Sequence, residues 1–335
     1  MEKKMSKGKR RVLSGMRPTG NLHLGHYIGV LENWKKMQIN DDCFYFVADW
    51  HALTTEYQDA SNIRKYTDEM IIDWLAAGID PEKATIFVQS DVLQHSELHL
   101  LLSMITPIPW LERVPSYKET KENLSNRDLS TYGFLGYPLL QTADILLYSA
   151  DVVPVGIDQV PHIELAREIA RRFNFIYGET VFIEPQPLLT STPKLPGTDG
   201  RKMSKSFDNC IYLADSPEEI EKKIKTMVTD PQRVRRNDPG NPEVCPVYAY
   251  HKVFSKSEEV KKIEDSCKDA SIGCVDCKKI LFNNIEEFFV EYSEKRAKIS
   301  SDREQISSIR KKGKERAYNE AEKMMEKVRN VMKLR

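Results

Sequence analysis

Two histidines lie where a predicted strand gives way to a predicted helix, a position that suits phosphate binding. His23 and His26 occur in RPTGNLHLGHYIG, residues 17–29, where Gly20 and Gly25 let a ligand approach the backbone closely. Free N–H groups and the dipole at a helix start favour anions, and imidazoles there can donate to phosphate oxygens. Taken alone, the string fits two surface histidines at a helix end equally well.

Two lysines far downstream have the charge that a departing pyrophosphate needs. Lys202 and Lys205 belong to the string KMSKS, residues 202–206, which follows a Gly-rich stretch. Lysines on a flexible loop can close on a triphosphate and offset its charge while a bond breaks. Each lysine alone is typical of solvated surface charge. Both strings in this order, in a chain with alternating strands and helices, favour catalysis.

Three polar residues share one face of an otherwise apolar helix predicted over residues 132–148. Tyr137, Gln141 and Asp144 are spaced i, i+4 and i+7, so their side chains lie on the same side. A solvated face is the simpler interpretation, but the neighbouring run DILLY indicates burial, and buried polar groups need partners. An ionised Asp144 accepts hydrogen bonds only, and therefore suits a donor-only group such as an indole N–H.

Four of the six cysteines crowd into one short stretch of the chain. They are Cys245, Cys267, Cys274 and Cys277, with the spacing C-x21-C-x6-C-x2-C. Four thiolates can hold tetrahedral zinc or an iron–sulfur cluster, and spacing alone does not separate the two. The other two, Cys43 and Cys210, are expected to be plain thiols.

The elements that must position these residues form an α/β pattern. From Arg11 to about residue 89, short apolar runs alternate with helical stretches as β-α-β-α-β, which predicts a parallel, Rossmann-like sheet with ligands beyond the carboxyl ends of its strands. A strand at VVPVG and a helix at HIELAREIARRFN follow. The polar stretch 118–131 and the run 185–200, rich in Pro, Gly, Ser and Thr, are expected to be loops.

After the KMSKS segment the sequence becomes helical and rich in charged residues. We expect a basic N-terminal extension over residues 1–10, a catalytic domain over 11–210 and an all-helical domain over 211–335. The chain has 335 residues, with 50 Lys and Arg against 50 Asp and Glu, so its net charge indicates no partner. Without an apolar leader or a membrane-length run, the sequence predicts a cytoplasmic protein.

The motifs resemble those of class I aminoacyl-tRNA synthetases, and among these the bacterial tryptophanyl-tRNA synthetases. The likeness rests on SGMRPTGNLHLGHYIG, FVADWHALT, ADILLYSADVVPVGIDQVPHIELAREIARRFN and GRKMSKS, and it spans nearly the whole chain. It implies activation of L-tryptophan by ATP with Mg²⁺ to an aminoacyl-adenylate, transfer to tRNA(Trp), no covalent enzyme intermediate, a C-terminal anticodon-binding domain and a homodimer.

The resemblance also assigns roles to single residues. It implies that the catalytic residues are His23, His26, Lys202 and Lys205. Tryptophan binding falls to Asp144 at the indole nitrogen, Tyr137 and Gln159 at the ammonium and carboxylate, Gln141, and Val153, Val155 and His51 around the ring. ATP binding falls to Arg17, Pro18, Thr19, Gly25, His26, Gly156, Ile157, Asp158, Leu195, Lys202, Met203, Ser204, Lys205 and Ser206.

The cysteine segments DPGNPEVC and SIGCVDCKK resemble those of a subset of bacterial tryptophanyl-tRNA synthetases that carry a four-iron four-sulfur cluster. This likeness favours a cluster over zinc at Cys245, Cys267, Cys274 and Cys277. The C-terminal run of mixed charge predicts a solvated amphipathic helix, whose basic residues, with Arg233, Arg235 and Arg236, are candidates for tRNA phosphate contacts.

Other interpretations stay open at this point. Tyrosyl-tRNA synthetases share the Y-x3-Q-x2-D pattern, and nucleotidylyltransferases share the H-x-G-H helix start but lack KMSKS. A metal-dependent RNA-binding module without catalysis is a third class. His95 and His99 are spaced i, i+4 but lack the glutamate of the zincin pattern, so we expect them to be surface histidines.

Overall fold

The computed structural model describes residues 8–123, 128–189 and 195–334, and its contacts divide the chain into two compact units. The first unit holds the described residues of 1–20, 34–191 and 302–335, and the second holds those of 21–33 and 192–301. Both units are therefore built from separated stretches of the chain. Among the described residues, no helix is long and apolar enough to cross a membrane.

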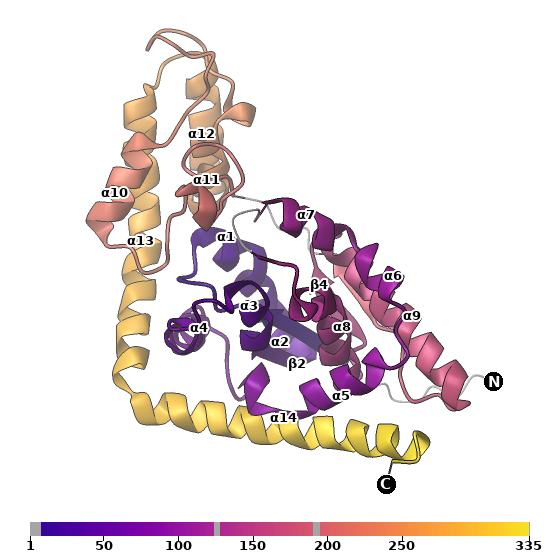
Figure 1. Ribbon diagram of the computed structural model, residues 1–335. Helices are drawn as coiled ribbons and strands as arrows, with labels where there is room; N and C mark the ends of the chain where they lie inside the picture. The colour runs from indigo at the N-terminus through magenta and orange to yellow at the C-terminus, as the bar shows by residue number, and fades with distance from the viewer. Residues whose placement is uncertain (1–7, 124–127, 190–194, 335) are drawn as a thin grey trace, which may run out of the picture. The chain divides into compact units, whose positions relative to one another are not determined.

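A five-stranded parallel sheet forms the centre of the first unit (Figure 1). Its order is β3-β2-β1-β4-β5, and all four neighbouring pairs are parallel, which confirms the expected α/β class. The order reverses between β1 and β4, the place where ligands of such sheets bind. The strands are β1 Arg11–Met16, β2 Asp42–Val47, β3 Ala84–Val88, β4 Val152–Val155 and β5 Gln186–Leu189.

Helices supply the crossovers that parallel strands require. Strands β2 and β3 are buried along nearly their whole length, as expected for strands covered on both faces. The helices of the first unit, up to the end of β5, are α2 Glu32–Asn40 (which begins in the second unit), α3 Asp49–Glu56, α4 Ile63–Ala76, α5 Gln94–Ser103, α6 Ile108–Glu112, α7 Pro115–Asn123, α8 Tyr132–Leu147 and α9 Val160–Tyr177.

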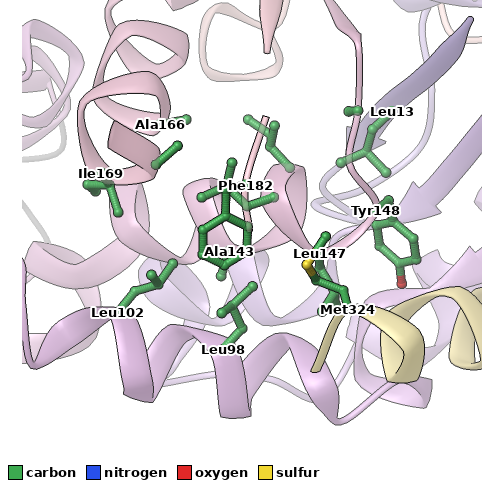
Figure 2. Packing of buried hydrophobic residues seen from close by; sticks show 14 of the residues in the cluster. Leu13, Leu98, Leu102, Ala143, Leu147, Tyr148, Ala166, Ile169, Phe182 and Met324 are labelled. Carbon is green, nitrogen blue, oxygen red and sulfur yellow. The ribbon is translucent and has the colours of Figure 1, made fainter. Parts of the chain in front are cut away.

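The main apolar core joins α5, α8 and α9 to the last helix of the chain, α14 Arg303–Val331. Figure 2 shows Leu98 and Leu102 of α5 on one side of the cluster and Leu147 of α8 on the other side, where Met324 of α14 lies beside it. All four side chains are at most 4% exposed. The C-terminal helix is thus part of the core of the first unit.

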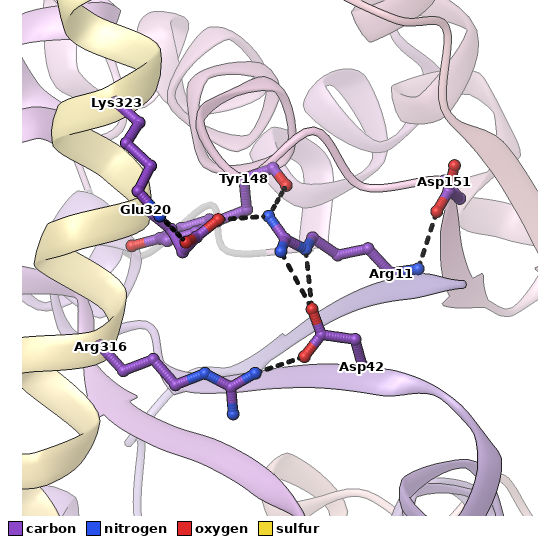
Figure 3. A network of polar contacts seen from close by, with 7 residues as sticks. All are labelled: Arg11, Asp42, Tyr148, Asp151, Arg316, Glu320 and Lys323. Carbon is purple, nitrogen blue, oxygen red and sulfur yellow. Dashed lines mark hydrogen bonds and ion pairs between the residues drawn. The ribbon is translucent and has the colours of Figure 1, made fainter. Parts of the chain in front are cut away.

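Polar contacts at the amino ends of β1 and β2 also hold α14 against the sheet (Figure 3). The guanidinium of Arg11 in β1 donates to Asp42 at 3.0 Å and to Glu320 of α14 at 2.8 Å. Arg316 of α14 donates to the other oxygen of Asp42 at 2.5 Å, and Lys323 contacts Glu320 at 2.6 Å. Because these groups are partly exposed, each pair adds only about 0.2–1 kcal/mol, so the apolar contact dominates.

The second unit is mainly helical over residues 217–301, as the sequence predicts. Its helices are α10 Pro217–Thr226, α11 Pro246–Phe254, α12 Ser257–Lys268 and α13 Cys274–Ser301. A small core of Ile220, Ile224, Leu281 and Ile285 joins α10 to α13. Helix α10 begins with a capping box, in which Ser216 and Glu219 bond each other's backbone N–H groups.

Three sequence expectations differ from the structure. Residues 118–123 lie in α7, although the polar stretch 118–131 was expected to be a loop; residues 124–127 lie outside the described chain. The run 185–200 contains the edge strand β5. The contact-based units also depart from the expected boundary at 210, since residues 302–335 pack with the sheet and residues 21–33 with the helical unit.

Gly313 provides a direct test of the helix docking. A Cβ at this position in α14 would lie 1.7 Å from the carbonyl oxygen of Ile86 in β3, so Gly313→Ala forces the helix away from the strand. We expect a loss of at least about 1–3 kcal/mol in the free energy of unfolding, measured by urea titration. Gly133→Ala in α8, whose Cβ would meet nothing within 4 Å, is the control and should change stability by less than about 1 kcal/mol. Equal stability of the two variants would contradict this docking.

Candidate functional site

Two loops follow strands on either side of the point where the sheet order reverses. Arg17, Pro18 and Thr19 come directly after β1, and the backbone N–H of Thr19 donates to the carbonyl of Arg17 at 2.9 Å. Residues Gly156 to Gln159 come directly after β4. Since both strands are parallel, the two loops lie at the same edge of the sheet.

The loop after β4 presents polar groups to solvent. Gly156, Ile157 and Asp158 are exposed, and a Cβ on Gly156 would lie 2.7 Å from a carboxylate oxygen of Asp158. Gln159 donates to Asp158 at 3.0 Å. The glycine is therefore what allows the Asp158 carboxylate to fold back over the loop.

Asp144 of α8 is a buried carboxylate surrounded by hydrogen-bond donors. It is 1% exposed. Its Oδ1 lies 2.8 Å from the amide nitrogen of Gln89 and 2.7 Å from Nδ1 of His95. Its Oδ2 lies 2.8 Å from Nε2 of His51. Because these partners come from α3, from the turn after β3 and from α5, three elements converge on one carboxylate.

The environment of Asp144 keeps it ionised. Burial alone raises the pKa of a carboxyl, but the hydrogen bonds and charges of His51 and His95 outweigh burial and hold the pKa of Asp144 well below its ordinary value. A carboxylate offers about four acceptor positions, two on each oxygen. Partners within the described chain fill two on Oδ1 and one on Oδ2. One acceptor position on Oδ2 is left for a donor.

A second chain of polar contacts begins two turns earlier on α8. Tyr137 shares its hydroxyl hydrogen bond with Ser116 at 2.8 Å, and the Ser116 hydroxyl lies 2.6 Å from Nε2 of His162. Burial lowers the pKa of His162 to about 4, so its ring is neutral at physiological pH. Gln141, like Tyr137, is half-buried on the face of α8 that carries Asp144, and Val153 and Val155 are buried in β4.

The HLGH segment, residues 23–26, lies in the second unit, where backbone hydrogen bonds hold it in place. The N–H of Leu24 donates to Ile211 at 2.9 Å, and the N–H of Leu213 donates to Leu22 at 2.9 Å. The short helix α1 Leu24–His26 begins between these bonds and continues as a π-helix over Tyr27–Leu31. Such wider turns are frequent at functional sites.

The two histidines lie against each other and against the lysine string. The rings of His23 and His26 stack with centroids 3.7 Å apart, and the N–H of Gly25 points at the sulfur of Met203 at 3.4 Å. Burial, followed by the charge of Lys205, lowers the pKa of His23 to about 4. Burial, His23 and Lys205 together lower the pKa of His26 further. Both imidazoles are thus neutral groups beside a lysine.

Asn209 organises the lysine loop. Its amide oxygen accepts from the N–H of Ser204 at 2.8 Å, and its amide nitrogen donates to Asp199 at 2.7 Å and to the carbonyl of Lys202 at 3.1 Å. Asn209 is 2% exposed, while Lys202 and Ser206 are exposed and Leu195 and Met203 are buried. The loop therefore has a fixed base with charged residues at its surface.

The four clustered cysteines converge within the second unit. Burial raises the pKa of Cys277 to about 12, and the neighbouring charges of Cys245, Cys267 and Cys274 raise it as well. Arg233, which is 9% exposed, lies 3.8 Å from the sulfur of Cys267. Across the described ranges, no group of three or more His, Cys, Asp or Glu side chains is arranged to hold a metal ion.

Some residues of these clusters were missed by sequence reasoning. His95 was expected at the surface, but it is fully buried and bonds both Asp144 and Tyr148. Its spacing to Leu98 and Leu102 places all three on one helix face, and this signal could have identified it. His99 is half-buried. Gln89, Ser116, His162 and Asn209 carried no comparable signal. Cys43 and Cys210 are buried thiols, as expected.

The chain matches a known protein family over most of its length. The family model described as "tRNA synthetases class I (W and Y)" matches residues 5–290. The chain belongs to this family.

Two bacterial relatives and one solved structure illustrate the likeness. "Tryptophan--tRNA ligase" of Thermotoga maritima is 57% identical over 326 residues, covering 97% of this chain and 99% of that protein. The protein of the same name from Aquifex aeolicus is 45% identical over 394 residues, covering 97% and 100%. A solved tryptophanyl-tRNA synthetase of Campylobacter jejuni, complexed with ADP and tryptophan, has a TM-score of 0.87 at 32% identity and covers 96% of this chain and 99% of that one.

The low pKa of His23 predicts a pH dependence of stability. Between pH 6.5, the ordinary histidine pKa, and pH 4 the unfolded chain binds a proton at His23 that the folded chain excludes. Stability therefore falls as the pH drops through this window, by up to about 1.4 kcal/mol per pH unit for one histidine. In His23→Gln, the free energy of unfolding, measured by urea titration at several pH values, should depend less steeply on pH between 4 and 6.5. An unchanged slope would contradict a buried neutral His23.

Proposed function

We propose that this chain is a tryptophan–tRNA ligase, which activates L-tryptophan with ATP and transfers it to tRNA(Trp). The observation that carries the proposal is the ionised Asp144, which keeps one acceptor position after His51, His95 and Gln89 are bonded. An indole N–H is a donor without acceptor capacity and matches that position. The names of the close relatives support the same assignment.

The proposed tryptophan site lies in the first unit. Asp144 accepts the indole N–H, while His51, Val153 and Val155 surround the ring and Gln141 lies on the same face of α8. Tyr137 and Gln159 bind the ammonium and carboxylate. For Tyr137 to accept from an ammonium, its own proton goes to Ser116, which in turn donates to the neutral His162. This chain of bonds orients the tyrosine oxygen toward a cation.

The proposed ATP-binding residues lie on the loops after β1 and β4, in the HLGH segment and in and near the KMSKS segment. Arg17, Pro18 and Thr19, with Gly156, Ile157 and Asp158, hold the nucleoside end, Asp158 through ribose hydroxyls. The other residues assigned to ATP are Gly25, His26, Leu195, Lys202, Met203, Ser204, Lys205 and Ser206. Magnesium accompanies ATP as part of the substrate.

The chemistry that these residues support is attack of the tryptophan carboxylate on the α-phosphate, with pyrophosphate as leaving group. Neutral His23 and His26 donate N–H groups to phosphate oxygens without requiring a proton from solution. Lys202 and Lys205 supply positive charge as charge develops on the departing pyrophosphate, an effect worth about 10²–10³ in rate for one lost donor. A hydroxyl at the tRNA terminus then attacks the carbonyl of the adenylate, which forms the aminoacyl ester and releases AMP.

For the four cysteines we infer a four-iron four-sulfur cluster, with zinc as the alternative. Cys245, Cys267 and Cys274 lie close enough to Cys277 to influence its pKa, and four thiolates can ligate such a cluster. Arg233 beside Cys267 would offset part of the negative charge of such a cluster. The ring of His251, whose Nε2 lies 3.4 Å from the Cys277 sulfur, would donate a hydrogen bond to that sulfur. Its proposed role is to support an anticodon-reading surface in the helical unit.

We also propose that the chain forms a homodimer and that its helical unit binds tRNA. Four large apolar side chains between residues 93 and 108 are more than half exposed in the single chain: Leu93, Leu100, Met104 and Ile108. Exposed apolar groups concentrated in one segment are typical of protein interfaces. Arg235 and Arg236, which are exposed on the second unit, are candidates for phosphate contacts.

Amino-acid-dependent exchange of pyrophosphate into ATP tests the function. We expect exchange with tryptophan and none with tyrosine. Asp144→Asn should weaken tryptophan binding by at least about tenfold, because it loses the charge and places a donor near the indole N–H. The variant also alters the bonds to His51 and His95, so its folding is checked by circular dichroism. Exchange with tyrosine instead, or unchanged tryptophan affinity in calorimetry, would overturn the assignment.

Metal analysis of anaerobically purified protein tests the cluster. We expect iron and acid-labile sulfide in the wild type and their loss in the double variant Cys274→Ser/Cys277→Ser. The control Cys210→Ala removes a buried thiol of the same unit outside the set and should keep its iron. The double variant should retain tryptophan-dependent exchange and lose tRNA charging or stability. One zinc and no iron in the wild type would contradict the cluster.

A further inference from the structure

The segment after β3 connects the proposed tryptophan site to the C-terminal helix. Gln89 and His95, which are both fully buried, bond Asp144 from this segment. The same segment carries Asp91, Gln94 and Glu97, whose side chains bond residues of α14 instead. Residues 89–97 thus have one set of side chains on the substrate-binding carboxylate and another on the last helix.

Arg329 makes the strongest of the contacts to α14. Its guanidinium donates to both carboxylate oxygens of Glu97, at 2.7 and 2.5 Å, and it also contacts Glu322. Glu322 accepts from the amide of Gln94 at 2.7 Å. Arg329 is 6% exposed, so the bonds form in a region with little water. Paired, fork-like bonds of this kind fix orientation as well as distance.

Arg310 makes an equivalent contact closer to the sheet. It donates to both oxygens of Asp91, at 2.8 and 3.2 Å, two residues after Gln89. Gly313 on the same helix lies against the backbone of Ile86 in β3. Helix α14 is therefore anchored to the strand, to the turn and to the helix that together carry Gln89 and His95.

We propose that Arg329 is a positioning residue for tryptophan binding, acting through Glu97 and α5 on the His95–Asp144 hydrogen bond. Without the guanidinium, Glu97 and Glu322 are left as neighbouring carboxylates that repel each other, and α5 loses its fixed seat on α14. The position of the His95 ring then becomes less defined, and with it the orientation of the Asp144 oxygen that accepts the indole N–H. This inference rests on the proposed function, and it concerns residues beyond the 5–290 range that the family model matches.

Steady-state pyrophosphate exchange with Arg329→Gln tests the proposal. We expect the KM for tryptophan to rise roughly three- to thirtyfold, the range that indirect couplings of this kind span, while kcat and the KM for ATP stay near wild type. Glu97→Gln, a smaller change at a partly exposed position, should raise the same KM, and the double variant should show no additive increase. Arg329→Lys keeps the charge but not the fork and should lie between wild type and Arg329→Gln.

Arg316→Gln is the matched control. Arg316 also lies on α14 and also pairs with a carboxylate, but its partner Asp42 lies at the amino end of β2. Gln89 instead follows the carboxyl end of the neighbouring strand β3. Its removal should lower the melting temperature without changing the KM for tryptophan. The proposal is overturned if Arg329→Gln and Glu97→Gln keep the wild-type KM, or if Arg316→Gln raises it equally. A wild type inactive with tryptophan would instead overturn the proposed function.

Discussion

The first unit is organised around one buried charge. An ionised carboxylate inside a protein is costly unless donors replace its lost water, and Asp144 is fully enclosed in α8. Its donors come from three other elements. Each of these elements must therefore be positioned so that its donor stays within hydrogen-bond distance of the Asp144 carboxylate. A loose α3 or α5 would leave a buried charge unpaired, which costs several kcal/mol. The stiffness around this group and its capacity to recognise a single donor are consequences of the same constraint.

Helix α14 helps to hold these donors in place, although it does not contact Asp144 itself through any of the hydrogen bonds described. It covers apolar side chains of α5 and α8 with Met324 and places Arg310 and Arg329 on the segment that supplies two of the donors. The partly exposed pairs of Arg11 and Arg316 contribute little energy each. Burial of apolar area provides most of the stability, whereas the buried guanidinium of Arg329 provides orientation.

The sequence predicted the parallel sheet because each strand up to β4 is a short apolar run bounded by turn residues. It did not predict β5, since an edge strand tolerates Pro187 and exposed positions that resemble a loop. Helix α7 was missed because an exposed polar helix has no apolar period. The shared face of Tyr137, Gln141 and Asp144 followed from helical spacing, but the partners of Asp144 are distant in sequence, and no local pattern specifies them. The catalytic and binding roles remain predictions.

The discontinuous first unit has a consequence for synthesis on the ribosome. The strands and α5, α8 and α9 emerge early, whereas α14 emerges only after the whole helical unit has been translated. Until then, the apolar core of the first unit lacks Met324 and the other buried side chains of α14, and Glu97 lacks its arginine. Domains usually fold as they emerge. The first unit, however, lacks part of its apolar core until α14 has been synthesised. We therefore expect nascent chains of this protein, and chains truncated before α14, to be more prone to aggregation than the complete chain.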